Sequence, residues 1–178
     1  GVQTCALPIL KNMATISLRG NPVHTIGELP AVGSKAADFE LVAKDLSRVS
    51  LADYKGQRLV LNVFPSLDTG TCAASVRYFN ELAGKLPDTK VLCISRDTPF
   101  AQSRFCGAEG LENVITLSDF ETGQFGKDYG LQVVDGPMKG FLSRVVILVD
   151  SEGTVSYTQQ VPVISDEPNY DEVVSKLG

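Results

Sequence analysis

The chain has 178 residues, a formal net charge of −5 and 43% hydrophobic residues, which fits a globular protein with a substantial core. It contains no basic run and no stripe of basic and aromatic residues, so we expect neither nucleic acid nor an anionic membrane surface as a partner. No apolar run approaches the roughly 18 residues that a membrane-spanning helix needs, and we expect a cytoplasmic protein.

Residues 1–12, GVQTCALPILKN, precede a methionine and are interpreted as a leader of foreign or mis-assigned sequence. Pro8 interrupts their apolar stretch, and no small-residue cleavage site follows, so they do not resemble a secretory signal. Cys5 has no role in this interpretation. Residues 13–178 are expected to form a single domain.

The first predicted element of this domain is a β-hairpin over residues 14–25, with Gly20 and Asn21 in its turn. His24, the only histidine, lies in its alternating pattern and is assigned a surface or packing role. A single histidine has no plausible second ligand or base partner for haem, zinc or Ser/His/Asp chemistry. We therefore expect metal-free chemistry without a cofactor.

Beyond the hairpin, short strands alternate with helices. The predicted strands cover residues 38–44, 49–51, 58–64, 90–95, 114–117, 143–150 and 154–160. The predicted helices cover residues 72–84, 99–106, 122–128 and 170–177. This alternation, followed by a hairpin and a last helix, predicts an α/β fold with a mixed central sheet and helices on both faces.

The most specific pattern lies between Val60 and Phe79, where an apolar strand stops at Pro65 and a polar loop leads into a helix. Cys72 therefore falls in the first turn of that helix. A helix N-terminus offers unpaired N–H groups and the positive end of the dipole, and both favour the reactive thiolate of a cysteine. Equally, a cysteine followed by two alanines can simply pack as a small core residue. Position alone does not decide between these interpretations.

Pro65, Thr69 and Cys72 form Pro-x-x-x-Thr-x-x-Cys between a strand and a helix, which resembles the active-site motif of the peroxiredoxins. The wider run FPSLDTGTCAASVRYFN, followed by SRFCGAEG, is similar to the thiol peroxidase subgroup, the bacterial, atypical two-cysteine members of that family. The resemblance extends from about Ala14 to the C-terminus. It implies a thioredoxin-like fold with an added N-terminal β-hairpin.

The remaining cysteines differ in their surroundings. Four cysteines are too few for a secreted disulfide scaffold, and none forms Cys-x-x-Cys, which argues against a thioredoxin-type oxidoreductase. Cys93 lies in the apolar run VLCIS and is interpreted as an inert core residue. Cys106 lies near an arginine where its helix is expected to end, and Gly107 and Gly110 make the backbone permissive there.

The resemblance implies that Cys72 is the peroxidatic cysteine and Cys106 the resolving cysteine of the same subunit. The Cys72 thiolate would attack a peroxide oxygen and become a sulfenic acid, which Cys106 would convert into a disulfide. The resemblance further implies hydrogen peroxide and organic hydroperoxides as substrates, thioredoxin as the reductant, and a homodimer built near the active-site face.

The supporting residues have physical roles in this chemistry. Thr69 would direct its hydroxyl toward the sulfur, and Pro65 would shield the thiolate from water. The resemblance places Arg144 beside the sulfur, where its charge would stabilise the thiolate and the peroxide oxygens. Without the resemblance, Thr69 is an ordinary loop or cap hydroxyl and Arg144 a solvated charge at a strand edge. Arg77 is a weaker candidate, which could instead pair with Glu81.

Two other functions stay open at this point. A redox-sensing module would use the same cysteines stoichiometrically, and turnover with a recycling reductant distinguishes it from a peroxidase. A structural or chaperone-like member of the fold would carry an inert cysteine, which titration of the Cys72 thiolate would reveal.

Overall fold

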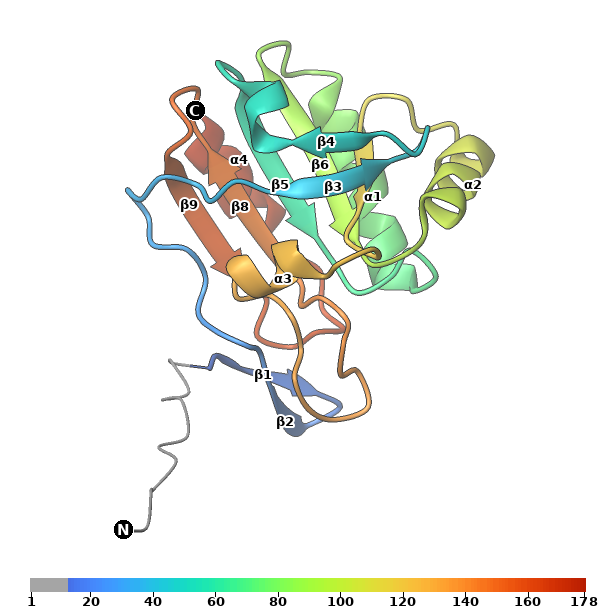
Figure 1. The fold of residues 1–178 in the computed structure, drawn as a ribbon, viewed down its shortest axis with the longest axis vertical. Helices are drawn as coiled ribbons and strands as arrows, with labels where there is room; N and C mark the ends of the chain where they lie inside the picture. Colours follow the sequence, from blue (N-terminus) through green and yellow to red (C-terminus); the bar gives the residue numbers. More distant parts are fainter. Residues whose placement is uncertain (1–12) are drawn as a thin grey trace, which may run out of the picture.

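The computed structural model describes residues 13–178 (Figure 1). The expected leader, residues 1–12, lies outside the described residues. The strands are β1 (Thr15–Leu18), β2 (Asn21–His24), β3 (Glu40–Ala43), β4 (Arg48–Ser50), β5 (Arg58–Val63), β6 (Thr89–Ser95), β7 (Ile115–Ser118), β8 (Val145–Val149) and β9 (Val155–Gln160). The helices are α1 (Gly70–Ala83), α2 (Pro99–Glu109), α3 (Gln124–Asp128), α4 (Tyr170–Leu177) and the short 3₁₀ helix η1 (Leu51–Tyr54).

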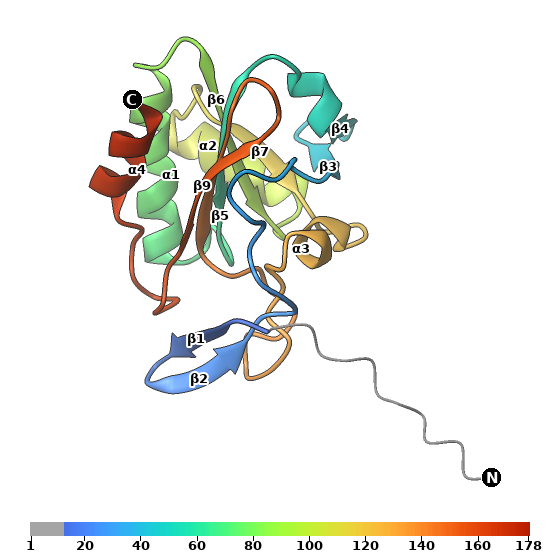
Figure 2. The same ribbon diagram turned by 90° about the vertical axis from the view of Figure 1, so that its left-hand side faces the viewer.

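Seven of these strands form one mixed sheet in the order β4-β3-β7-β6-β5-β8-β9. The central strands β5, β6 and β7 are parallel, whereas β3 and β8 run antiparallel to β7 and β5. Figure 2 shows α1 and α4 on one side of this sheet and α3 on the other. The predicted α/β fold, a mixed central sheet flanked by helices with an N-terminal hairpin, is confirmed.

Each face of the sheet carries its own apolar cluster, because side chains alternate along a strand. The cluster under α1 and α4 includes Val60, Phe64, Cys72, Val76, Phe79, Val91, Cys93, Val146, Leu148, Val173 and Leu177, with Phe105 and Cys106 of α2 packed against it. The opposite cluster gathers Leu59, Leu61, Val63, Leu92, Ile94, Leu117, Val145 and Ile147 around Phe39, Phe125 and Tyr129. Helices α1 and α2 thus contact the same face, which is where Cys72 and Cys106 lie.

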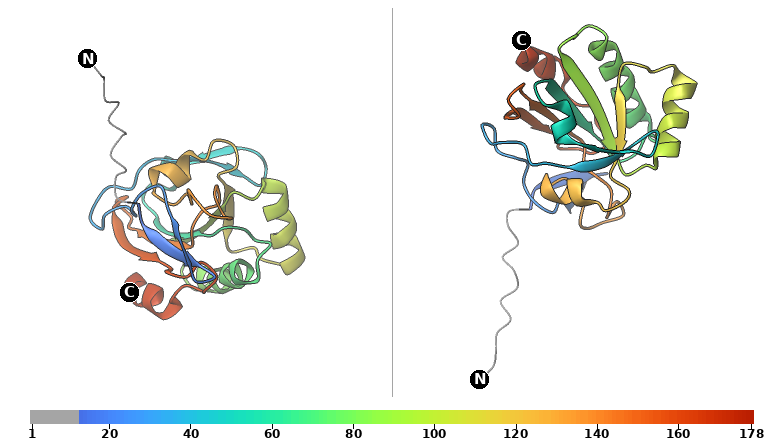
Figure 3. Two further views of the ribbon diagram at one scale, coloured as in Figure 1. Left: turned by 90° about the horizontal axis from the view of Figure 1, so that it is seen from below. Right: turned by 45° about the horizontal axis from the view of Figure 1, so that its top comes forward.

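The N-terminal hairpin forms a separate two-stranded sheet, which lies over one end of the main sheet when the molecule is seen from below (Figure 3). Its turn consists of Arg19 and Gly20, both with positive φ, and Asn21 already pairs with Leu18. The predicted turn at Gly20 and Asn21 is therefore wrong by one residue, because two left-handed residues close the tightest hairpin loop and these are Arg19 and Gly20.

His24 ties this hairpin to the loop that precedes β8. Its Nδ1 lies 2.6 Å from Asp135 Oδ2, and its backbone N–H donates to Asp135 Oδ1 at 2.7 Å. The imidazole is partly exposed. His24 therefore has a structural role at the partly exposed surface, in line with the predicted surface or packing role.

Most predicted boundaries agree with the observed ones to within two residues, but two regions differ by more. Helix α2 continues past Cys106 to Glu109 and ends at Gly110, whose φ of 66° is the left-handed conformation typical of a helix C-terminus. Cys106 therefore lies inside the last turn rather than at the helix end. The 3₁₀ helix η1 was not predicted, and it begins at Leu51, which was expected to end a strand; Asp53 Oδ2 accepts the backbone N–H of Ser50 there at 2.8 Å.

After α3, the backbone at Gly130 packs directly against the backbone of Gly27 and Glu28. An added Cβ would lie 2.2 Å from the carbonyl oxygen of Glu28, and φ is 70°. Gly130→Ala should lower the free energy of unfolding by at least about 3 kcal/mol, because the clash adds to backbone strain. Gly20→Ala is the control, since its φ is 81° but no atom of residues 13–178 other than its chain neighbours lies within 4 Å of an added Cβ. We expect a loss of about 1 to 2 kcal/mol. Equal losses in chemical denaturation would contradict the packing argument.

Candidate active site

The loop between β5 and α1 begins where Pro65, which is buried, ends the strand. The carboxylate of Asp97, just after the neighbouring strand β6, holds this loop: it accepts Ser66 Oγ at 2.7 Å and the backbone N–H of Leu67 at 2.8 Å. Asp97 was not among the residues predicted from the sequence. Its position after β6 could have indicated this contact, because the carboxyl ends of adjacent parallel strands meet at one edge of a sheet, which is where the loop after β5 begins.

Helix α1 begins immediately after this loop, with Thr69 as its N-cap and Cys72 as its third residue. Cys72 therefore lies in the first helical turn, as predicted from the sequence. Its side chain is fully buried in the cluster under α1 and α4. Ser75 Oγ donates to the carbonyl oxygen of Cys72 at 2.8 Å, and Asn62 of β5 donates to Ser75 Oγ at 3.3 Å. These bonds fasten the turn to the sheet beneath it.

Thr69 uses its hydroxyl within the loop. Thr69 Oγ1 donates to the carbonyl oxygen of Ser66 at 3.1 Å, and no side-chain bond from Thr69 caps the helix. A hydroxyl has one proton to donate and two lone pairs to accept with. Accepting a hydrogen bond is therefore the role that this geometry leaves to Thr69.

Arg144 immediately precedes β8 and is 2% exposed, so it is not the solvated charge that its strand-edge position alone would suggest. Its Nε donates to the carbonyl oxygen of Ile164 at 2.9 Å. Its Nη1 is buried and has no hydrogen-bond partner among the described residues. A buried guanidinium with a free N–H favours an anion or a strong hydrogen-bond acceptor beside it.

Two observations place Arg144 on the α1 side of the sheet. Val146 and Leu148 belong to the cluster under α1 and α4, and residues two positions apart along an extended chain share a face. Burial raises the pKa of Tyr170 at the start of α4, and the positive charge of Arg144 opposes this rise. Tyr170 in turn stacks on Tyr78 of α1, with ring centroids 3.9 Å apart. Arg144 and Cys72 thus lie on the same side of the sheet.

The three described cysteines are free thiols with distinct surroundings. Cys93 is fully buried in β6, and burial raises the pKa of its thiol to about 12. Burial also raises the pKa of Cys106, an effect that the positive charge of Lys44 opposes. Cys106 is only half-buried and borders a cavity of about 630 Å³ that Lys44, Ser103 and Thr116 also line. A reagent can therefore approach Cys106 from solvent.

Arg77 pairs with neither Cys72 nor Glu81. It forms a two-bond ion pair with Glu109 at the end of α2, with both N–O distances 2.9 Å, and its guanidinium carbon lies 5.9 Å from the ring centroid of Phe105. The hydrogen bonds of this pair lower the pKa of Glu109 and raise that of Arg77. Arg77 therefore connects α1 to α2, close to the turn that carries Cys106.

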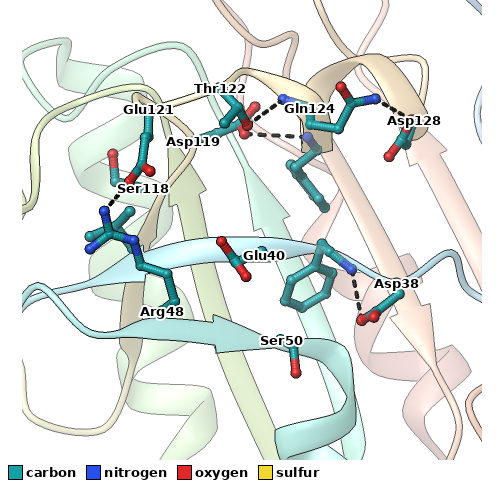
Figure 4. Close-up of a pocket in the computed structure, with 13 residues that line it drawn as sticks. Asp38, Glu40, Arg48, Ser50, Ser118, Asp119, Glu121, Thr122, Gln124 and Asp128 are labelled. Carbon is teal, nitrogen blue, oxygen red and sulfur yellow. Dashed lines mark hydrogen bonds and ion pairs between the residues drawn. The ribbon is translucent and has the colours of Figure 1, made fainter.

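A second hollow lies apart from the cysteines, between β3, β4 and the segment that leads into α3 (Figure 4). Its volume is about 450 Å³, and five carboxylates line it: Asp38, Glu40, Asp119, Glu121 and Asp128. Arg48 pairs with Glu121, and Asp119 accepts the backbone N–H groups of Phe125 and Gly126 at 3.3 and 2.9 Å. Burial nevertheless raises the pKa of Asp119. The bonds of Asp119 therefore hold the start of α3, and the ion pair of Glu121 holds the preceding segment to β4.

Comparisons with known proteins identify the family of the chain. The profile of the family described as Redoxin matches residues 31–174. Thiol peroxidases from Mycobacterium bovis and Mycobacterium tuberculosis are 51% identical to the chain over 166 residues, which cover 93% of this chain and 99% of each relative. The chain belongs to the redoxin family. Within that family it is a peroxiredoxin of the thiol peroxidase subgroup, a group of enzymes with peroxidase activity.

Solved redoxin structures share the fold. A peroxiredoxin-like protein from Aquifex aeolicus has a TM-score of 0.87 at 41% identity, and the match covers 93% of this chain and 97% of that one. A thiol peroxidase from Chromobacterium violaceum has a TM-score of 0.86 at 22% identity over 93% and 96% of the two chains. In this redoxin, none of the helices within residues 13–178 is long and apolar enough to cross a membrane.

The buried state of Cys93 generates a prediction about thiol reactivity. Alkylation requires the thiolate, and with a pKa of about 12 only about one Cys93 thiol in ten thousand is ionised at pH 8. In the folded, reduced protein at pH 8, iodoacetamide should modify Cys106 and leave Cys93 unmodified, whereas both should react in denaturant. Peptide mass spectrometry measures both sites. Equal modification of Cys93 and Cys106 in the folded protein would contradict the inert role of Cys93.

Proposed function

We propose that this thiol peroxidase reduces hydrogen peroxide and organic hydroperoxides through Cys72 and Cys106. The observation that carries the proposal is the buried Nη1 of Arg144, which has no hydrogen-bond partner within residues 13–178 and lies on the sheet face that also holds Cys72 in the first turn of α1. A thiolate nucleophile and a fixed cation beside it are what attack on a peroxide requires.

In the first step, the Cys72 thiolate attacks one oxygen of ROOH. The S–O bond forms, the O–O bond breaks, and the other oxygen leaves as alkoxide or hydroxide, which takes up a proton to become alcohol or water. Arg144 Nη1 donates to the oxygens on which negative charge develops. Thr69 Oγ1 accepts the peroxide O–H, and the buried Pro65, which has no N–H, excludes water from the sulfur.

In the second step, the Cys106 thiol condenses with the Cys72 sulfenic acid, which releases water and forms a disulfide. The Cα atoms of a disulfide lie about 4.4–6.8 Å apart. In the reduced protein the two cysteines are free thiols in two different helices, Cys72 in the first turn of α1 and Cys106 in the last turn of α2. We propose that the turn at Cys72 and the segment 105–110 unwind before the bond forms. Gly107 and Gly110 ease the second rearrangement.

In the last step, an external dithiol reduces the disulfide and returns both thiols, so the net reaction converts ROOH and a dithiol into ROH, water and a disulfide. We assign this role to thioredoxin, whose paired cysteines supply two electrons per cycle. The cavity beside Cys106 supports access for a reductant. The cycle consumes reduced dithiol continuously, which fits a cytoplasmic setting.

The proposal includes a homodimer built near the active-site face. Phe100 and Phe120 are 69% and 41% exposed, and they follow the carboxyl ends of β6 and β7. This is the edge of the sheet where β5 leads to Cys72. Exposed phenylalanines at this edge support an interface there, since contact with a second copy would bury them.

The nucleophile prediction compares three cysteine variants with thioredoxin, thioredoxin reductase and peroxide present. Cys72→Ser should abolish turnover, because no other described cysteine lies at a helix N-terminus. Cys106→Ser should abolish recycling by thioredoxin while one thiol per chain is still oxidised. Cys93→Ser should retain most of the activity. Comparable losses in the Cys72 and Cys93 variants would refute the assignment, and stoichiometric oxidation without turnover in the wild type would favour a redox sensor.

The cation prediction compares two arginines. Arg144→Met should lower kcat/KM for peroxide by about 10²- to 10³-fold, the size expected when a donor to developing charge is removed. Arg77→Met should change kcat/KM by less than about tenfold, because Arg77 is engaged with Glu109. Stopped-flow rates of thiol oxidation measure both. Equal effects of the two substitutions would remove Arg144 from the proposed mechanism.

The assembly prediction concerns Phe100. Sedimentation velocity at micromolar concentration should give a dimer for the wild type and a shift toward monomer for Phe100→Glu, because a buried charge opposes association. A wild-type monomer in both redox states would rule the dimer out.

A further inference from the structure

The segment between β9 and α4, residues 161–166, forms a strap beside the active site. The N-terminal hairpin fixes the backbone of the strap: Ser17 N–H donates to the carbonyl oxygen of Pro162 at 2.8 Å, and Ile164 N–H donates to the carbonyl oxygen of Ser17 at 2.9 Å. The Ile164 side chain is buried with Ile16 and Val23 of the hairpin. The strap therefore has a defined position that the hairpin sets.

The strap presents two consecutive carbonyl groups to the candidate active site. The carbonyl oxygen of Ile164 accepts Arg144 Nε at 2.9 Å, and that of Ser165 accepts Thr71 Oγ1 at 2.8 Å. Thr71 immediately precedes Cys72. One rigid segment thus holds both the cation and the helical turn that carries the thiol.

Apart from the bond between Ser75 and the carbonyl oxygen of Cys72, the first turn of α1 has little support at its start. Thr69 makes no side-chain cap bond, the first turn contains no acidic residue, and its first residue is Gly70, a poor helix former. A helix end with these features unwinds readily unless tertiary contacts hold it. The bond from Thr71 to the strap is such a contact, and it lies at the partly exposed end of the turn.

We propose that Thr71 is a positioning residue: its hydrogen bond to Ser165 keeps the first turn of α1 closed and thereby sets how fast the turn unwinds after Cys72 is oxidised. The hairpin acts on the same step through the strap. This inference rests on the proposed function, because unwinding matters only if Cys72 must reach Cys106. The closed turn favours reaction with peroxide, and the open turn favours the disulfide.

A consequence concerns overoxidation. While the turn stays closed, the Cys72 sulfenic acid remains beside Arg144 and can react with a second peroxide to give the sulfinic acid. Losing the Thr71 bond should therefore speed disulfide formation and reduce the sulfinic fraction. A single hydrogen bond of this kind changes such an equilibrium by about two- to tenfold.

The test compares wild type, Thr71→Val and Thr71→Ser. Valine keeps the branched shape and the helix propensity of threonine but lacks the hydroxyl, whereas serine keeps the hydroxyl. Hydrogen exchange of residues 70–76 in the reduced proteins reports the closed turn directly. Rapid mixing with peroxide, followed by mass spectrometry, reports the rates of sulfenic acid loss and disulfide formation and the sulfinic fraction.

We expect Thr71→Val to exchange about two- to tenfold faster at residues 70–76, to form the disulfide faster by a similar factor and to show a smaller sulfinic fraction. The rate of the first reaction with peroxide should stay within about twofold, because the closed turn remains the major population of the reduced variant, and Thr71→Ser should behave as wild type. Wild-type exchange in Thr71→Val, or Thr71→Ser matching Thr71→Val, overturns the proposal. So does faster exchange without faster disulfide formation. If no variant forms a disulfide, the proposed function itself fails, while the exchange rates still decide whether Thr71 holds the turn.

Discussion

Cys72 lies fully buried in an intact helical turn, and in the proposed mechanism that turn opens so that a disulfide with Cys106 can form. Some features around the thiol stabilise the closed turn of the reduced protein, and others make it easier for the turn to open. Asp97 fixes the loop before α1, and Ser75 and Asn62 fasten the turn to the sheet. The absence of a Thr69 cap bond and Gly70 at the helix start keep the same turn easy to unwind.

The buried guanidinium of Arg144 supplies the positive charge on the side of the sheet that holds the Cys72 turn. Removing a cation from water is unfavourable unless its N–H groups find acceptors, and one described donor, Nη1, has none. The strap satisfies Nε and orients the group. In the proposed mechanism, the thiolate and the peroxide oxygens complete the hydrogen bonding of the guanidinium. Burying the guanidinium lowers the stability of the fold, but it leaves a donor that stabilises the negative charge on the peroxide oxygens during the reaction.

The sequence was sufficient to predict the order of strands and helices, the place of Cys72 in a first helical turn and the buried position of Cys93. These features follow from local periodicity and from motifs within about ten residues. The ion-pair partners of the charged residues could not be predicted from the sequence, because they depend on which segments pack together in the fold. Arg77, for example, pairs with Glu109 in another helix and not with Glu81 one turn away. The contacts of Asp97 also depend on tertiary packing. The strap carbonyls could not be predicted either, because every residue type has a backbone carbonyl. The hairpin turn was misplaced because Arg19 adopts a positive φ, which is rare for a residue other than glycine. The end of α2 was misplaced because Gly110, and not Gly107, takes the left-handed conformation that ends the helix.

The most direct test of the opening of this turn is amide hydrogen exchange in the fully reduced protein and in the form that carries the Cys72–Cys106 disulfide. We predict that amides of residues 71–76 and 104–110 are protected in the reduced form and lose protection in the disulfide form, while the central strands β5 and β6 keep theirs. Equal protection of both segments in the two forms would contradict the requirement that the turn at Cys72 opens.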